Sequence, residues 1–214
     1  MVQHPLNEIV LYRAVVTLLL IATHSFTIFS GGGGDWPYPP GIEPCNLYVW
    51  ILHFAAHAML GGFTFISGYL LVHQRDKMLQ QSYKTFMFRK SRRLLLPGIL
   101  FSLLYIWMFE EHAFSALLRF CYTLSDGHMW YLPMLMWCLF YGYYLLKHDI
   151  SLKKAAIVSL FLLSLYFLPL PFNLRKFFLY VPYFTLGMMA YAYRDWIIRK
   201  SELLLKGGGI CACL

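Results

Sequence analysis

Residues 47–72 read LYVWILHFAAHAMLGGFTFISGYLLV, a run that contains no aspartate, glutamate, lysine or arginine. As a single α-helix the run would be about 39 Å long, enough to cross a bilayer, which takes ~20 apolar residues. The rest of the chain is similar, because 59% of its 214 residues are hydrophobic and only 13% are charged, against about a quarter in an average soluble chain. This composition excludes a cytosolic enzyme and a secreted disulfide domain. It predicts an all-α fold, a polytopic transmembrane helical bundle.

Five further apolar runs are predicted as spans, so that we expect about six in all. They cover residues 9–29, 94–109, 129–146, 155–168 and 177–193. The span at 94–109 would have Pro97 in its first turn, where proline is tolerated. We expect a loop at 31–44, which holds four consecutive glycines and four prolines, and a polar connector at 110–128.

The basic residues predict the side of the membrane that each segment faces, because cytoplasmic loops retain Lys and Arg. With the N-terminus inside, fourteen Lys and Arg residues fall in inner segments and three in outer loops. Seven of the fourteen lie within 75–93. We therefore expect a cytoplasmic N-terminus, a transmembrane domain over residues 1–196 and a disordered cytoplasmic tail over residues 197–214.

Two ionisable residues of the first span are candidate functional residues, since such side chains are costly inside a bilayer. Arg13 and His24 are eleven residues apart, which places them within about 20° of one helix face and ~16 Å apart along the axis. The alternative is that Arg13 extends to the inner headgroups and that His24 is hydrogen-bonded within the bundle.

The second span carries small residues in the stretch GGFTFISGYLL, from Gly61 to Leu71. Small residues allow helices to approach one another closely, which is one interpretation. The other is that Ser67 and Gly68 open the helix where it lines a ligand cavity, because irregular backbone at membrane depth is tolerated there.

The basic segment before the third span ends in FRKSRRLLLP, where Arg89 and Arg92 lie one helical turn apart and Arg93 follows. Clusters of this kind bind anionic lipid. Guanidinium pairs also bind phosphate groups bidentately, so a phosphorylated cytoplasmic cosubstrate is the second interpretation.

Histidines mark two further places. His128 precedes Trp130 and Tyr131 at the outer mouth of the fourth span, where the alternative is a helix-end histidine that meets water. His53 and His57 share a helix face with the spacing of metal or haem ligands. Without a matching pair in another span, hydrogen-bonded core histidines are the interpretation that this spacing favours.

Taken together and in order, five motifs resemble the membrane acyltransferase family 3. They are Arg-x10-His (Arg13, His24), FxxxSGYLL (from Phe63), RxxRRLLLP (from Arg89), HxWYL (from His128) and FxxG (Phe184, Gly187). The resemblance implies an integral membrane O-acyltransferase that transfers an acetyl or other acyl group from acetyl-CoA to a hydroxyl of an extracytoplasmic polysaccharide or lipid-linked sugar. It also implies more spans than the six predicted, so that the chain is expected to be truncated at its C-terminus.

Residue by residue, the resemblance implies roles for several side chains. His24 would be the catalytic histidine and Arg13 its motif partner. Arg89 and Arg92 would hold the CoA phosphates, and Ser67 and Gly68 would line the donor path. Substrate binding is assigned to His128, Trp130 and Tyr131 at the outer mouth.

The expected cosubstrate is acetyl-CoA, with no metal and no nucleic acid, and the expected partners are membrane lipids and the glycan acceptor. The expected location is a bacterial plasma membrane, crossed several times. Two other classes stay open: a non-catalytic truncated remnant or small membrane transporter, and a haem- or metal-binding protein that uses His53 and His57.

Overall fold

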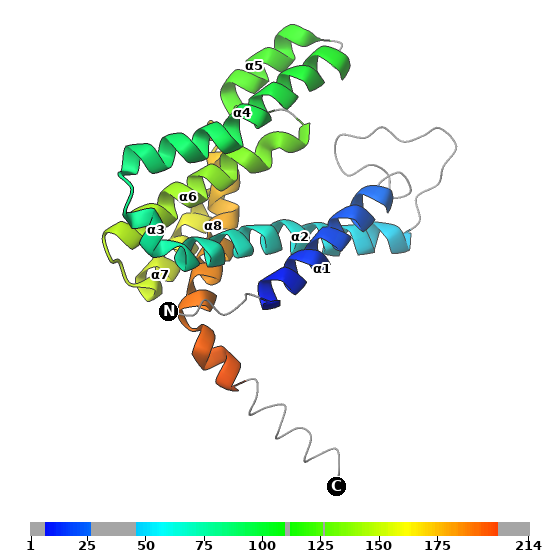
Figure 1. Cartoon of the computed structure of the whole chain (residues 1–214). Helices are drawn as coiled ribbons and strands as arrows, with labels where there is room; N and C mark the ends of the chain where they lie inside the picture. The colour runs from blue at the N-terminus through cyan, green and yellow to red at the C-terminus, as the bar shows by residue number, and fades with distance from the viewer. Residues whose placement is uncertain (1–6, 27–45, 110–111, 126, 201–214) are drawn as a thin grey trace.

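The computed structural model describes residues 7–26, 46–109, 112–125 and 127–200, and the regular elements in these ranges are all helical (Figure 1). The elements are α1 (Asn7–Phe26), α2 (Asn46–His73), α3 (Arg75–Leu79), α4 (Tyr83–Phe109), α5 (Ala113–Thr123), η2 (Gly127–Trp130), α6 (Tyr131–Lys147), α7 (Leu152–Leu163), η3 (Ser164–Phe167) and α8 (Leu174–Ala192). The all-α class predicted from the composition is confirmed.

Each apolar run predicted as a span corresponds to one of the long helices α1, α2, α4, α6, α7 or α8. Among the described residues, only Tyr83–Met108 of α4 forms a helix that is both long and apolar enough to cross a membrane, judged by length and composition. The number of spans and the side of the N-terminus therefore stay predictions. The Gly/Pro loop expected at 31–44 lies outside the described residues.

Helix α4 differs from its predicted boundaries, because it begins at Tyr83 and includes most of the basic segment. Lysine and arginine are good helix formers, so their charge does not end the helix. Pro97 lies inside α4 rather than in its first turn, which makes the predicted position wrong. Because Pro97 has no amide hydrogen, the carbonyl of Arg93 lacks its usual helical donor.

The connector predicted at 110–128 contains a second unexpected element, the amphipathic helix α5. Ala116 of this helix is fully buried, whereas Phe114, Leu118 and Tyr122 are exposed at helical spacing along one side. The connector expected to be polar therefore contains a helix, in agreement with the 3.6-residue apolar spacing of its middle.

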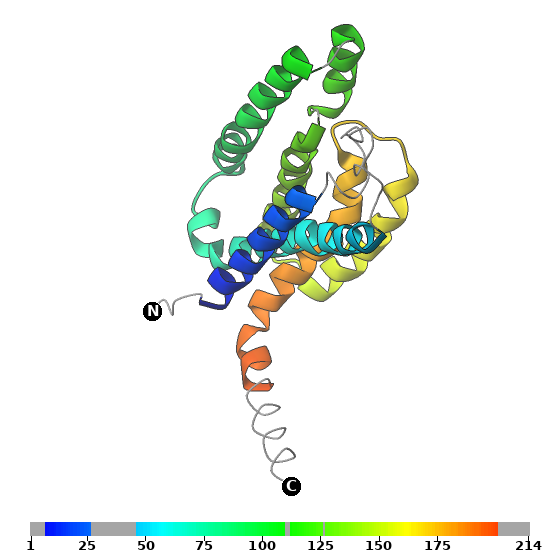
Figure 2. The ribbon, with the colours of Figure 1, turned by 90° about the vertical axis from the view of Figure 1, so that its right-hand side faces the viewer.

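The core of the bundle lies around α8, which packs against α2, α6 and α7 (Figure 2). Met134 and Cys138 of α6 and Val181, Phe184 and Met188 of α8 are fully buried there. In water, burial of such a side chain stabilises a fold by roughly 1.5–3 kcal/mol. Where lipid surrounds the bundle, van der Waals packing between helices stabilises it instead.

The hairpin of α4 and α5 projects from one end of this bundle (Figures 1 and 2). The end of α5 is hydrogen-bonded to the bundle through Asn173. Its Nδ2 donates to the carbonyl of Thr123 at 2.7 Å and to Ser125 Oγ at 2.8 Å. The amide of Phe172 also donates to the carbonyl of Tyr122 at 2.8 Å. These bonds join the end of α5 to the beginning of α8.

The segment expected to be a disordered tail begins with helix, because residues 194–200 are helical. Residues 201–214 lie outside the described residues.

Candidate functional site

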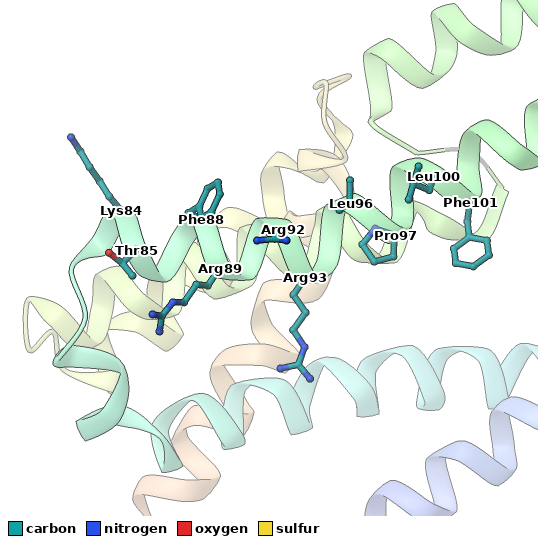
Figure 3. Close-up of a pocket in the computed structure, with 10 residues that line it drawn as sticks. All are labelled: Lys84, Thr85, Phe88, Arg89, Arg92, Arg93, Leu96, Pro97, Leu100 and Phe101. Carbon is teal, nitrogen blue, oxygen red and sulfur yellow. The ribbon is translucent and has the colours of Figure 1, made fainter.

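An open groove of about 910 Å³ lies along one face of α4. We call it the α4 groove. It is lined by Lys84, Thr85, Phe88, Arg89, Arg92, Arg93, Leu96, Pro97, Leu100 and Phe101 (Figure 3). Its first half is cationic and its second half is apolar, so it suits a ligand with an anionic part and an apolar part.

The predicted phosphate ligands Arg89 and Arg92 are thus brought together in one groove, with Arg93 and Lys84 beside them. Arg89 and Arg93 extend from α4 on the side of α2, whereas Lys84 extends the opposite way (Figure 3). Arg89 Nη1 donates to Gln81 Oε1 at 3.3 Å, which holds this side chain across the start of the helix. The groove therefore offers at least two guanidinium groups to one anion.

The register between α4 and α6 places this cationic half beside the middle of α6. Ser91 Oγ lies 3.6 Å from Met136 Sδ, and the rings of Phe86 and Tyr143 stack with centroids 4.8 Å apart. A Cβ atom at Gly98 would already meet Leu132, near the start of α6. The arginines therefore belong to a helix that packs along α6 and not to a separate loop.

The two small-residue motifs meet at the crossing of α2 and α8. A Cβ atom at Gly68 would collide with the backbone carbonyl of Phe184, and one at Gly187 would collide with that of Phe65. Each glycine thus packs directly on the backbone of the other helix. Gly68 was predicted to line the donor path, but it is buried in this crossing, and close helix packing is the interpretation that the geometry supports.

Ser67, the other residue assigned to the donor path, lies next to this crossing and is partly exposed. Its Oγ donates to the carbonyl of Phe63 at 2.9 Å, one turn back in α2. The hydroxyl is therefore satisfied within its own helix, which is continuous here from Asn46 to His73. No opening of the helix at Ser67 is present.

Two of the three residues predicted to bind the acceptor have described side chains, and they point to different neighbours. Trp130 packs against Tyr180, with ring centroids 5.8 Å apart. The ammonium group of Lys176 lies over the Trp130 ring, 4.7 Å from its centroid. Tyr131 instead places its hydroxyl 3.3 Å from Thr64 Oγ1 of α2. Tyr131 therefore belongs to a partly buried hydroxyl pair within the bundle rather than to the outer mouth.

The remaining predicted site residues are placed by their backbone. Arg13 and His24 both lie on α1, and Arg13 is exposed and lines none of the three described pockets. The side chains of His24, His128, His53 and His57 lie outside the described residues.

Lys84 and Thr85 also line the groove and were not predicted from the sequence. Residues 85, 89, 92 and 96 recur at three- and four-residue spacing, which places them on one helix face. The same spacing extends the Arg89–Arg92 pair in both directions along the helix. It could have identified Thr85 and Leu96, had the helix been predicted to begin before residue 94.

Comparisons with known proteins identify the family to which the chain belongs. The sequence matches the family described as "Acyltransferase domain" over residues 6–213. The searches of curated proteins and of solved structures found no match. Because the match spans nearly the whole chain, including the crossing of α2 and α8 and the α4 groove, the chain belongs to this acyltransferase family, and acyltransferase activity in general is the function that its membership supports.

Proposed function

We propose that this protein is an integral membrane O-acyltransferase that transfers an acetyl or other acyl group from acetyl-CoA to a hydroxyl of an extracytoplasmic polysaccharide or lipid-linked sugar. The family match supports the reaction class. The observation that carries the choice of donor is the α4 groove, in which Arg89, Arg92 and Arg93 surround one hollow.

The donor is proposed to bind with its phosphates on the guanidinium groups of Arg89 and Arg92. Charge-assisted hydrogen bonds are stronger than neutral ones, and a guanidinium fork matches two phosphate oxygens. The apolar half of the groove, from Leu96 to Phe101, is next to these groups and suits the less polar arm that carries the thioester.

In the proposed transfer, His24 acts as general base. Its neutral imidazole takes the proton of the acceptor hydroxyl as that oxygen attacks the thioester carbonyl. The new C–O bond forms, the C–S bond breaks, and the thiolate of CoA leaves and is protonated by the imidazolium. Arg13 lies ~16 Å from His24 along α1, so its proposed role is to hold the donor and not to touch the reacting carbonyl.

We place this reaction in a bacterial plasma membrane that the chain crosses about six times, with the N-terminus in the cytoplasm. The acceptor would then approach from the side of η2, which contains His128 and Trp130 and leads into α6. One apolar helix of sufficient length and the general membrane association of the family support a membrane location.

The catalytic step is tested with His24→Ala in membranes supplied with radiolabelled acetyl-CoA. We expect incorporation of label into the host glycan to be abolished while the protein level stays unchanged. The matched control is His112→Ala, which removes an exposed histidine ahead of α5. Unchanged acetyl content in His24→Ala would overturn the proposal, and substrate flux in liposomes without transfer would favour the non-catalytic alternative.

The donor site is tested separately by binding of acetyl-CoA to the purified Arg89→Gln, Arg92→Gln double variant. Hydrogen bonds to charged groups contribute about 1.5 kcal/mol or more each, so we expect a loss of roughly 100-fold in affinity. Pantetheine, which has no phosphate, is expected to bind both proteins equally. Equal affinity of the two proteins for acetyl-CoA would exclude phosphate recognition by this pair.

A further inference from the structure

The ten residues that line the α4 groove form two parallel rows on one helix. Residues four positions apart lie on the same side of an α-helix, so each row runs along α4 and the groove lies between the rows. Figure 3 shows Lys84 and Phe88 on one edge of the helix and Arg89 and Arg93 on the other. One row is Lys84, Phe88, Arg92, Leu96 and Leu100, and the other is Thr85, Arg89, Arg93, Pro97 and Phe101. A ligand that lies along α4 therefore meets side chains of both rows at each turn.

Among the lining residues, Phe88 is the one aromatic residue in the cationic half of the groove. Its side chain is 68% exposed. Lys84 and Arg92 lie one turn before and one turn after it in the same row, and Arg89 lies beside it in the other row. An uncovered aromatic ring between cations fits a ligand that combines an aromatic ring with anionic groups. A phospholipid supplies the anion but not the ring, whereas a nucleotide supplies both.

The order of the side chains along the groove gives such a ligand a direction. The four lining residues beyond Arg93 are apolar. In CoA the diphosphate joins the pantetheine arm to a ribose, and the same ribose carries adenine and the 3′-phosphate. When the arm lies in the apolar half, the diphosphate lies at Arg92 and Arg93. The nucleoside end then reaches Phe88 and Arg89, and Arg89 lies about 6 Å before Arg93 along the helix axis.

We propose that Phe88 is the adenine-binding residue of the donor site and that Arg89 binds the 3′-phosphate, an assignment that rests on the proposed transfer from acetyl-CoA. The adenine ring stacks on the ring of Phe88, while the diphosphate is bound by Arg92 and Arg93. A guanidinium has five N–H donors. One donor of Arg89, at Nη1, is bonded to Gln81 Oε1 at 3.3 Å, which fixes the side chain and leaves other donors for the 3′-phosphate.

The stacking contact is tested by the binding of two ligands to the purified full chain in detergent. They are acetyl-CoA and S-acetylpantetheine, which has the arm but no nucleotide. Phe88→Leu keeps an apolar side chain and removes the ring. We expect its affinity for acetyl-CoA to fall roughly tenfold, as removal of a base-stacking ring does, while its affinity for S-acetylpantetheine stays unchanged. Phe88→Trp keeps an aromatic ring and should retain the affinity for acetyl-CoA.

Two matched variants separate this contact from a general effect of losing an exposed ring. Phe114→Leu removes a ring of α5 that is 77% exposed and is not part of the groove, and it should bind both ligands as the unaltered protein does. Phe101→Leu removes a ring from the apolar half of the groove. It should weaken both ligands to the same extent, because both carry the arm.

The role of Arg89 is tested by comparing acetyl-CoA with acetyl-3′-dephospho-CoA. The unaltered protein should bind acetyl-CoA roughly tenfold more tightly, as expected for a hydrogen bond between charged groups. Arg89→Gln should lose this preference. Arg93→Gln should weaken both compounds alike, because both keep the diphosphate.

Three results would overturn the assignment and leave acetyl-CoA as the donor. The first is equal affinity of Phe88→Leu and the unaltered protein for acetyl-CoA. The second is loss of the 3′-phosphate preference in Arg93→Gln instead of Arg89→Gln, which would reverse the ligand in the groove. The third needs no substitution: adenosine 3′,5′-bisphosphate should compete with acetyl-CoA, and an absence of competition would contradict a nucleotide site. Failure of the unaltered protein to bind acetyl-CoA at all would overturn the proposed function and this assignment with it.

Discussion

The crossing of α2 and α8 and the α4 groove are opposite environments built from the same set of family motifs. At the crossing, Gly68 and Gly187 each lie against the backbone of the facing helix, so no further atom fits. In the groove, Arg89, Arg92 and Arg93 are three of the ten residues of a single helix that line about 910 Å³ of open space. Motif residues therefore set the distance between helices at the crossing, whereas the role that we propose for those of the groove is to bind the donor.

The largest effect is expected at the crossing itself. Gly68→Ala and Gly187→Ala each force a methyl group into backbone atoms that cannot rotate away, and we expect each to lower the free energy of unfolding by at least about 3 kcal/mol. Thermal unfolding in detergent measures this loss. The control is Gly98→Ala, whose one tight contact is with Leu132 Cδ1 at 3.0 Å, the end of a side chain, and which gains about 1 kcal/mol of helix propensity. Equal stability of Gly98→Ala and Gly187→Ala would show that the crossing can relax.

A smaller loss is expected next to the crossing, at Gly142 of α6. A Cβ atom there would lie 2.5 Å from Leu71 Cδ2 and 2.7 Å from Phe184 Cε1, and both of these are side-chain atoms. Because side chains can shift at some cost in a packed core, we expect Gly142→Ala to lose about 1–2 kcal/mol. The same unfolding assay applies. A loss of stability as large as that of Gly187→Ala would show that the side chains around Gly142 cannot shift to make room for the methyl group.

A loss of about 1 kcal/mol is expected from Tyr131→Phe, which removes the hydroxyl paired with Thr64 Oγ1 at 3.3 Å. The pair lies within the bundle, so the effect should appear in stability. A double-mutant cycle with Thr64→Val isolates the pairwise contribution. Additive losses in the cycle would show that the two hydroxyls do not interact.

The smallest effect on stability is expected in the α4 groove. Arg89 and Arg92 are exposed, so Arg89→Gln and Arg92→Gln should each change the free energy of unfolding by no more than about 0.5 kcal/mol, while the affinity for acetyl-CoA falls. Unfolding and binding are measured on the same samples. A large loss of stability without a loss of affinity for acetyl-CoA would show that these arginines stabilise the fold and do not bind the donor.

Much of the fold was predictable because apolar run length is a local property of the sequence. The runs at 9–29, 47–72, 129–146, 155–168 and 177–193 each correspond to a helix. The start of α4 was not predictable in this way. Apolar run length places the start of this helix at residue 94, whereas helix propensity allows a lysine- and arginine-rich segment to continue into an apolar one.

In the candidate site, too, features within one helix were predictable from the sequence and contacts between helices were not. Helical spacing within one element predicted that Arg89 and Arg92 share a face, and the groove confirms that they lie together. Contacts between elements were not encoded in any spacing. The pairing of Tyr131 with Thr64 joins residues that are 67 positions apart, and the glycines of the crossing are further apart still.

By itself, the sequence determined the helical class, the family and the clustering of arginines on one helix face, because composition, motif order and 3.6-residue spacing are all read along a single chain. Only the tertiary structure decided that Gly68 packs against α8, that Tyr131 turns into the bundle, and that the arginines lie beside the middle of α6. These three outcomes depend on the register between helices. Register is set by the interlocking of side chains and glycines across an interface, which no single segment contains.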